Sequence, residues 1–209
     1  MQSVLCFGDS LTWGHDPATG GRHAYEDRWP TVLTEGLPGV NVIAEGLRGR
    51  STCRDNGSAP CDYNGARALP MILHTHAPID VVVIMLGLND IWQGWRPDQV
   101  GAGLKRLVEI VRTHPYRVDA PAPDVLLVSQ PPLVAGNDPT VTGPLIAASR
   151  RLEVVTRIAA QEFGRVPTVD MRGIAEASPL DCVHLDAENT RKMGAALVAP
   201  VKAMLEARE

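Results

Sequence analysis

A hydroxyl, an imidazole and a carboxylate occur in this chain at positions that suit nucleophilic catalysis. Ser10 follows a short apolar segment, whereas Asp181 and His184 lie three residues apart near the other end of the chain. A serine hydroxyl is a weak nucleophile until a base takes its proton, and neutral imidazole suits that task. In a turn, residues i and i+3 face the same way. We therefore expect Ser10 as the nucleophile, His184 as the base and Asp181 as the acid that orients the base.

Three hydrogen-bond donors are candidates for stabilising the oxyanion that such a reaction creates. They are the backbone N–H of Ser10, the backbone N–H of Gly49 and the side-chain amide of Asn89. Gly49 lacks a Cβ, so a substrate can approach its backbone closely. Each donor follows an apolar segment, and donors at three strand ends can converge on one oxygen, as acyl transfer requires.

Aromatic residues follow two of these positions closely. Trp13 comes after Ser10, and Trp92 and Trp95 come after Asn89. Aromatic side chains near an active site often form its walls, although they can also belong to a core or a subunit interface. We expect these tryptophans to bind substrate and to favour a small acyl group such as acetyl.

The elements that must position these residues are short apolar runs alternating with segments of helical period, which is typical of βαβ units on a parallel sheet. Such sheets bind ligands at the carboxyl ends of their strands, where Ser10, Gly49 and Asn89 would meet. Prolines inside two of the helical segments, Pro70 and Pro200, are expected to kink or break them. The expected strands are residues 3–7, 40–44, 79–86, 125–128 and 166–169, and the expected helices are residues 28–36, 64–76, 97–114, 145–163 and 187–207.

Two connections, residues 47–62 and 130–143, are long for a compact fold. Structureless loops of this length are usually functional, so we expect them to shape the choice of substrate. The first of them contains Cys53 and Cys61, which are close enough in sequence for a disulfide. A cytosolic chain would instead hold all four of its cysteines as thiols.

Length and composition limit the classes of protein. The chain has 209 residues, which predicts one domain over residues 1–209, and 44% apolar with 21% charged residues is ordinary for a globular protein. There is no basic run to bind nucleic acid or an anionic membrane, and no apolar run near the roughly 20 residues that span a bilayer. The start of the chain lacks a signal-peptide pattern, so we expect a cytoplasmic protein.

The segments Gly8-Asp9-Ser10-Leu11, Gly49, Asn89 and Asp181-x-x-His184 resemble, in order and spacing, the four blocks of the SGNH (GDSL-type) hydrolase superfamily. Their flanking residues resemble a narrower branch of bacterial arylesterases, acetylesterases and acyltransferases. The resemblance covers nearly the whole chain. It implies a flavodoxin-like three-layer αβα sandwich whose five parallel strands have the order 2-1-3-4-5. The resemblance also implies the catalytic and oxyanion roles given above for Ser10, Gly49, Asn89, Asp181 and His184. It implies no metal or other cofactor, and it is compatible with a homo-oligomer.

The expected activity is a serine esterase that hydrolyses short-chain esters, such as aryl acetates or acetylated carbohydrates, with the small-molecule ester as its partner. An acyltransferase or perhydrolase, or a thioesterase or lysophospholipase, would use the same site and remain alternatives. A flavodoxin-like binding module without catalysis is another. A metal-dependent hydrolase using Asp9, Asp90 and His184 is a third, although Asp9 is better explained as a residue that caps the turn beside Ser10.

Overall fold

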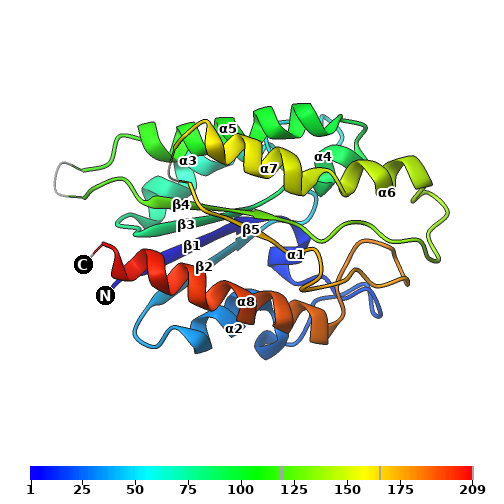
Figure 1. The fold of residues 1–209 in the computed structure, drawn as a ribbon, viewed down its shortest axis with the longest axis horizontal. Coiled ribbons are helices and arrows are strands. Elements are labelled where there is room, and N and C mark those ends of the chain that lie inside the picture. Colours follow the sequence, from blue (N-terminus) through cyan, green and yellow to red (C-terminus); the bar gives the residue numbers. More distant parts are fainter. Residues whose placement is uncertain (118–119, 165, 209) are drawn as a thin grey trace.

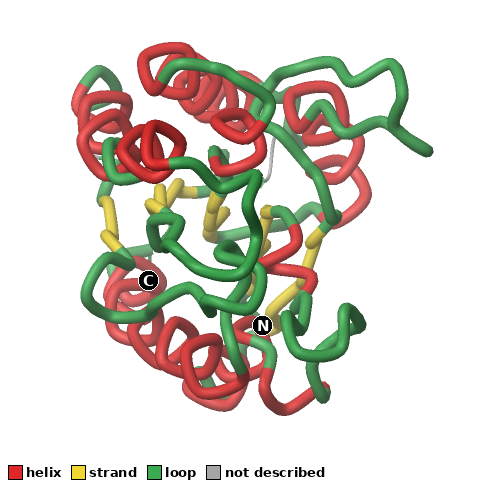
Figure 2. Tube along the Cα trace, turned by 90° about the vertical axis from the view of Figure 1, so that its right-hand side faces the viewer, coloured by secondary structure: helices red, strands yellow, loops and turns green. Residues whose placement is uncertain are grey.

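The computed structural model, which describes residues 1–117, 120–164 and 166–208, has a five-stranded sheet between two layers of helices (Figure 1). The strand order is β2-β1-β3-β4-β5 and all four pairings are parallel, so the predicted three-layer α/β fold is confirmed. Figure 2 shows the strands enclosed by helices above and below. Helices α2 and α8 cover one face, and α3, α5 and α7 cover the other. In chain order the elements are β1 (Ser3–Gly8), α1 (Ser10–Trp13), the 3₁₀ helix η1 (Tyr25–Asp27), α2 (Trp29–Gly36), β2 (Asn41–Gly46), α3 (Gly65–His76), β3 (Val81–Met85), α4 (Leu88–Trp92), α5 (Pro97–Thr113), β4 (Asp124–Ser129), α6 (Gly143–Ser149), α7 (Leu152–Gln161), β5 (Thr168–Asp170) and α8 (Ala187–Glu206).

The register of the three strands β2, β1 and β3 sets the floor of the site. All five residues of β3 are buried, as expected for a run of β-branched side chains covered on both faces. Gly8 at the end of β1 pairs with Gly46 of β2 on one side and with Met85 of β3 on the other. The three strands therefore end at the same level, and the segments that follow them start from one edge of the sheet.

Prolines do not interrupt the two helices in which they lie. Helix α3 continues through Pro70, and α8 continues through Pro200, which corrects the expectation of a break. A proline removes one backbone donor, whereas both helices keep a buried apolar face that includes Leu73 in α3 and Val201 in α8. Packing of these faces against the sheet outweighs the lost hydrogen bond.

The helix predicted over residues 145–163 is wrong as a single element, because the chain forms α6 and α7 instead. The N–H of Arg151 bonds to the carbonyl of Ala148, three residues back, which tightens the chain at this point. The Ser149 hydroxyl donates to the carbonyl of Ile146 and accepts from the N–H of Leu133. These bonds hold the end of α6 against the loop after β4, and a separate helix, α7, begins at Leu152.

The last strand begins later than predicted. Pro167 has no N–H, although its carbonyl accepts from the N–H of Leu127, so ladder pairing starts at Thr168 rather than at residue 166. All four cysteines are free thiols, and Cys53 and Cys61 are not bridged. Among the described residues no helix is both long enough and apolar enough to cross a membrane.

Close packing of α8 on α2 gives a test of the helical layer. A Cβ on Gly194 would lie 2.7 Å from the carbonyl oxygen of Trp29 and 2.7 Å from the Cβ of Val32. We expect Gly194→Ala to lower the free energy of unfolding by about 1–3 kcal/mol, because backbone must shift to admit the methyl group. Urea denaturation measures this. Gly143→Ala is the control, since its Cβ would meet nothing within 4 Å, and equal losses in both variants would contradict the packing argument.

Candidate active site

The end of β1 presents Ser10 at the first position of a one-turn helix. The Asp9 carboxylate caps α1 by accepting from the N–H of Leu11 at 3.0 Å. A Cβ on Gly8 would collide with the Thr12 side chain at 2.0 Å, so the chain can turn this tightly only with glycine there. Ser10 is buried as a residue, with 8% of its surface exposed. The turn therefore fixes the backbone from which the hydroxyl projects.

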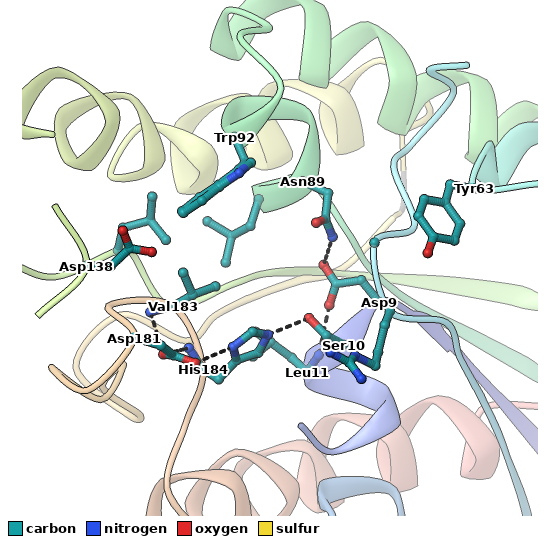
Figure 3. Close-up of a pocket in the computed structure, with 14 residues that line it drawn as sticks. Asp9, Ser10, Leu11, Tyr63, Asn89, Trp92, Asp138, Asp181, Val183 and His184 are labelled. Carbon is teal, nitrogen blue, oxygen red and sulfur yellow. Dashed lines mark hydrogen bonds and ion pairs between the residues drawn. The ribbon is translucent and has the colours of Figure 1, made fainter. Parts of the chain in front are cut away.

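The structure joins the three residues predicted to act together (Figure 3). The Oγ of Ser10 lies 2.8 Å from Nε2 of His184, and Nδ1 of His184 lies 2.6 Å from Oδ2 of Asp181. Asp181 and His184 lie on the loop between β5 and α8. With the ring proton on Nδ1, the imidazole donates to the carboxylate and accepts from the hydroxyl. This arrangement can move a proton from Ser10 to His184.

A strained turn holds the acid and the base in this geometry. Cys182, between them, is buried and has φ of 67°, in the left-handed region that a residue with a Cβ rarely adopts. Its N–H donates to the carbonyl of Ser178 at 2.9 Å, which helps to keep it there. The turn lets Oδ1 of Asp181 accept from the backbone N–H groups of both Val183 and His184. Such strain, about 1–3 kcal/mol, is found where function requires a fixed geometry.

The charge states of the relay follow from burial and hydrogen bonding. Burial lowers the pKa of His184 below the ordinary 6.5, although the bond to Asp181 opposes this shift. Burial alone would raise the pKa of Asp181, but the hydrogen bonds from the backbone and ring of His184 lower it overall. At neutral pH the ring is therefore neutral and the carboxylate is ionised, which is the state that a general base needs.

The three predicted oxyanion donors lie around the same cavity. Within the part of the chain that the structure describes, the backbone N–H groups of Ser10 and Gly49 have no hydrogen-bond acceptor. Both N–H bonds of the Asn89 amide are engaged, with Oδ2 of Asp9 and the carbonyl of Arg50, each at 3.0 Å. An oxyanion would have to share one of these two bonds or replace it.

Both the backbone conformation at position 49 and the nearby Tyr63 ring require a glycine there. Gly49 has φ of 85°, and a Cβ there would lie 2.6 Å from the ring of Tyr63. Tyr63 follows the long loop 47–62 and lines the cavity beside Gly49. The glycine thus allows the aromatic wall and the backbone donor to lie next to each other.

Asp9 joins the segments that follow three different strands. Besides capping α1, its carboxylate accepts from the Asn89 amide and, at 2.8 Å, from the Gln130 amide, which follow β3 and β4. Burial raises the pKa of Asp9 to about 6, although the hydrogen bonds from Gln130 and Leu11 oppose the shift. Asp9 is therefore a positioning group, as predicted for a residue that ties down this turn.

The structure does not place Asp9, Asp90 and His184 where the three could bind one metal ion, as a metal-dependent hydrolase would require. The Asp90 carboxylate does not line the cavity, and it accepts from the backbone N–H and the hydroxyl of Thr52. Among the described residues, Asp9, Asp90 and His184 do not form a group of possible metal ligands. Asp90 instead anchors the start of the loop around Thr52 to helix α4.

A cavity of about 500 Å³ opens over the relay, within the range usual for small-molecule sites. Its apolar side chains come from α1, α4 and the later loops, and its polar ones include residues that the sequence did not single out individually. Tyr63, Leu133 and Asp138 lie in or beside the two long connections, and loop length was the only signal for them. The lining residues are Asp9, Ser10, Leu11, Arg48, Gly49, Tyr63, Leu88, Asn89, Trp92, Leu133, Asp138, Asp181, Val183 and His184.

Of the three tryptophans predicted to contact substrate, Trp92 lines this cavity and the other two do not. The ring of Trp13 lies 5.2 Å from the guanidinium of Arg48, so it supports a lining residue rather than lining the cavity itself. Gly94, with φ of 87°, turns the chain after α4. Trp95 consequently packs against the core instead.

Comparison with known proteins finds relatives over nearly the whole chain. The model of the GDSL-like Lipase/Acylhydrolase family matches residues 6–190. A solved carbohydrate acetylesterase family member from Sinorhizobium meliloti is 44% identical and has a TM-score of 0.94, with 99% of this chain and all of that chain covered. The aryl esterase of M. smegmatis is 36% identical with a TM-score of 0.89, over 98% and 100% of the two chains. An arylesterase of Vibrio mimicus is 29% identical over 115 residues, so the match spans about half of each chain, 53% of this one and 49% of that protein.

The Thr52–Asp90 contact predicts a pH-dependent stability. Burial raises the pKa of Asp90 from 3.8 to about 6, so its own stabilising contribution is lost as the pH rises through about 6. The Thr52 hydroxyl, 2.7 Å from the carboxylate, offsets part of that loss. We expect Thr52→Val to lower the free energy of unfolding by about 1–3 kcal/mol at pH 8 and by less at pH 5, where Asp90 is neutral.

Urea denaturation at the two pH values measures this effect. The matched control is Thr190→Val, because the buried Thr190 hydroxyl has no hydrogen-bond partner in the described structure. The control should change stability little at either pH. A loss for Thr52→Val that is the same at pH 5 and pH 8 would rule out the charged carboxylate as its cause.

Proposed function

The chain belongs to the GDSL-like lipase/acylhydrolase family, and from that premise we propose that it is a serine esterase that hydrolyses short-chain carboxylic esters through an acyl-enzyme. The observation that carries this proposal is the relay from Ser10 through His184 to Asp181, with contacts of 2.8 and 2.6 Å at the wall of a cavity. A hydroxyl, a neutral ring and an ionised carboxylate in this order are the parts of a serine hydrolase.

The relay performs both halves of the reaction. His184 Nε2 accepts the hydroxyl proton as the Oγ of Ser10 attacks the ester carbonyl carbon. The Asp181 carboxylate stabilises the imidazolium that forms, and this imidazolium then gives the proton to the departing alcohol. Water attacks the acyl-serine with His184 again as the base, which releases the carboxylic acid and restores the hydroxyl.

The oxyanion of each tetrahedral intermediate takes its hydrogen bonds from the N–H groups of Ser10 and Gly49 and from the Asn89 amide. The first two N–H groups have no acceptor among the described residues, so no existing hydrogen bond must break before they donate. Asn89 loosens its bond to the Arg50 carbonyl as the negative charge develops, because an anionic oxygen is the stronger acceptor.

The names of the relatives and the mixed apolar and polar lining of the cavity support an acetyl-type ester of an aryl or carbohydrate alcohol. Relatives are described as aryl esterases and as a carbohydrate acetylesterase family member. Leu88, Trp92 and Val183 give the cavity an apolar wall, while Arg48 and Asp138 bring polar groups to it. Aryl acetates and acetylated carbohydrates are therefore the proposed substrates. A cytoplasmic location, a homo-oligomer and transfer to acceptors other than water stay predictions.

Replacement of the nucleophile tests the function. We expect Ser10→Ala to abolish hydrolysis of an aryl acetate and to leave the fold intact, because only the hydroxyl is removed. A fluorophosphonate probe should label the wild-type protein at Ser10, as located by mass spectrometry, and should not label the variant. Ser58→Ala, at an exposed serine, is the control and should react like the wild type. Full turnover by Ser10→Ala would refute the assignment.

Removal of the Asn89 amide tests the oxyanion site. We expect Asn89→Ala to lower kcat on the order of 10²–10³-fold with a small change in KM, because the lost donor acts mainly in the transition state. Gln130→Ala is the control, since Gln130 does not line the cavity but its amide donates to Asp9 and its oxygen accepts from the N–H of Leu88, next to Asn89. If both variants lose the same part of kcat, Asn89 acts only by positioning the groups around it and not as an oxyanion donor.

A further inference from the structure

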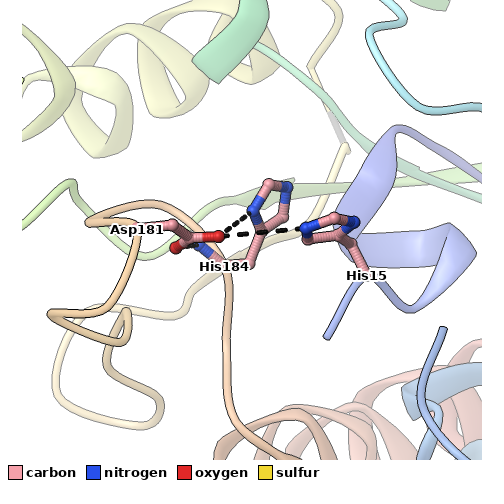
Figure 4. A group of neighbouring side chains, drawn as sticks. All are labelled: His15, Asp181 and His184. Atoms are coloured by element: carbon pink, nitrogen blue, oxygen red, sulfur yellow. Dashed lines mark hydrogen bonds and ion pairs between the residues drawn. The ribbon is translucent and has the colours of Figure 1, made fainter. Parts of the chain in front are cut away.

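A buried histidine that the relay does not use lies directly against it. His15 follows α1 and has 9% of its surface exposed, and its ring centroid is 4.0 Å from that of His184 (Figure 4). Neither ring nitrogen of His15 has a hydrogen-bond partner among the described residues, and Nδ1 is fully enclosed. Because Nδ1 is enclosed, Nε2 is the ring nitrogen of His15 that a ligand can reach.

The other ring nitrogen of His15 faces the acid of the relay. Its Nε2 lies 3.9 Å from Oδ2 of Asp181, the same oxygen that contacts Nδ1 of His184. One ligand atom each from His15, Asp181 and His184 can be chosen so that all three lie within 4.8 Å of one another. Two imidazoles and one carboxylate are a donor set that Zn²⁺ uses in proteins, with a fourth position left for water.

We infer that His15, Asp181 and His184 form a binding site for a divalent transition metal of the zinc type, and that its occupation switches off hydrolysis. Binding uses Nε2 of His15, Oδ2 of Asp181 and Nδ1 of His184. The binding step stands on this geometry alone, whereas the inhibition rests on the proposed esterase function.

The movements required at Asp181 are small. Ligand atoms bound tetrahedrally at about 2.0–2.2 Å from Zn²⁺ are about 3.3–3.6 Å apart. The Asp181–His184 contact, now 2.6 Å, therefore opens, and the Asp181–His15 separation, now 3.9 Å, closes. Both changes are of a size that side-chain rotation can supply.

The proton position explains why the metal inhibits. In the relay, the neutral His184 ring carries its proton on Nδ1 and keeps the lone pair of Nε2 for Ser10. A metal bound to Nδ1 takes the lone pair of that nitrogen, so the single proton of the neutral ring moves to Nε2 through solvent. Nε2–H then faces the Oγ of Ser10 at 2.8 Å as a donor and can no longer accept the hydroxyl proton.

Metal binding is tested first without turnover. In Ser10→Ala, which keeps all three ligands, Zn²⁺ is titrated in competition with a chromogenic chelator. We expect one Zn²⁺ per chain, and at least about tenfold weaker binding when His15→Phe is added, since the phenyl ring keeps the packing on His184 but cannot ligate. Asp181→Asn, added instead, should also weaken binding. His74→Phe, at an exposed histidine, is the matched control and should bind as before.

Inhibition is tested next in proteins that keep Ser10. Zn²⁺ should inhibit hydrolysis of an aryl acetate, a chelator should reverse this, and His15→Phe should raise the half-inhibiting Zn²⁺ concentration at least about tenfold relative to His74→Phe. Equal zinc binding with and without His15 would overturn the site, and binding without inhibition would overturn the switch. A wild-type protein without esterase activity would defeat the proposed function instead, while the chelator titration would still decide the metal site.

Discussion

The hydrogen bond between the Oγ of Ser10 and Nε2 of His184 joins parts of the chain that are 174 residues apart, and the site exists only while both ends are held. Ser10 is held by a buried strand and a capped helical turn. His184 is held by a loop of 16 residues between β5 and α8, in which a left-handed residue, Cys182, sets the direction of the ring. An error of about 1 Å at either end would replace a proton-transfer contact with a gap.

The polar network under the cavity explains why a second carboxylate lies next to the nucleophile without taking part in the relay. Asp9 receives hydrogen bonds from α1 and from the segments after β3 and β4, so it fixes the relative positions of Ser10 and Asn89. Burial of Asp9 disfavours the negative charge on its carboxylate, whereas the hydrogen bonds that the carboxylate accepts favour that charge. The same carboxylate therefore organises the donors that the oxyanion needs, at a cost in desolvation that only a satisfied network can offset.

Much of this arrangement can be predicted from the sequence because it depends on residues near strand ends. The apolar runs and their order determine the parallel sheet, and the sheet brings the segments after β1, β2 and β3 to one edge. The break between α6 and α7 could not be predicted, because it depends on the contact of Ser149 with a distant loop. The same holds for the tryptophans, since the turn at Gly94 sends Trp95 away from Trp92. The partnerless ring of His15 and the position of Asp138 likewise depend on loop conformations that no periodic pattern encodes.

The two long connections, residues 47–62 and 130–143, determine where the cavity can change its walls without loss of the site. Both connections also hold parts of the site, because the first contains Gly49 and the N–H of Val134 in the second donates to the carbonyl of Cys182. The side chains of Tyr63, Leu133 and Asp138 line the cavity without taking part in the proton path. Substitutions of these three side chains can therefore remodel the cavity walls while the backbone contacts that hold the reacting atoms are kept. Divergent evolution or a focused mutant library could therefore change the substrate selectivity at these walls without changing the catalytic residues.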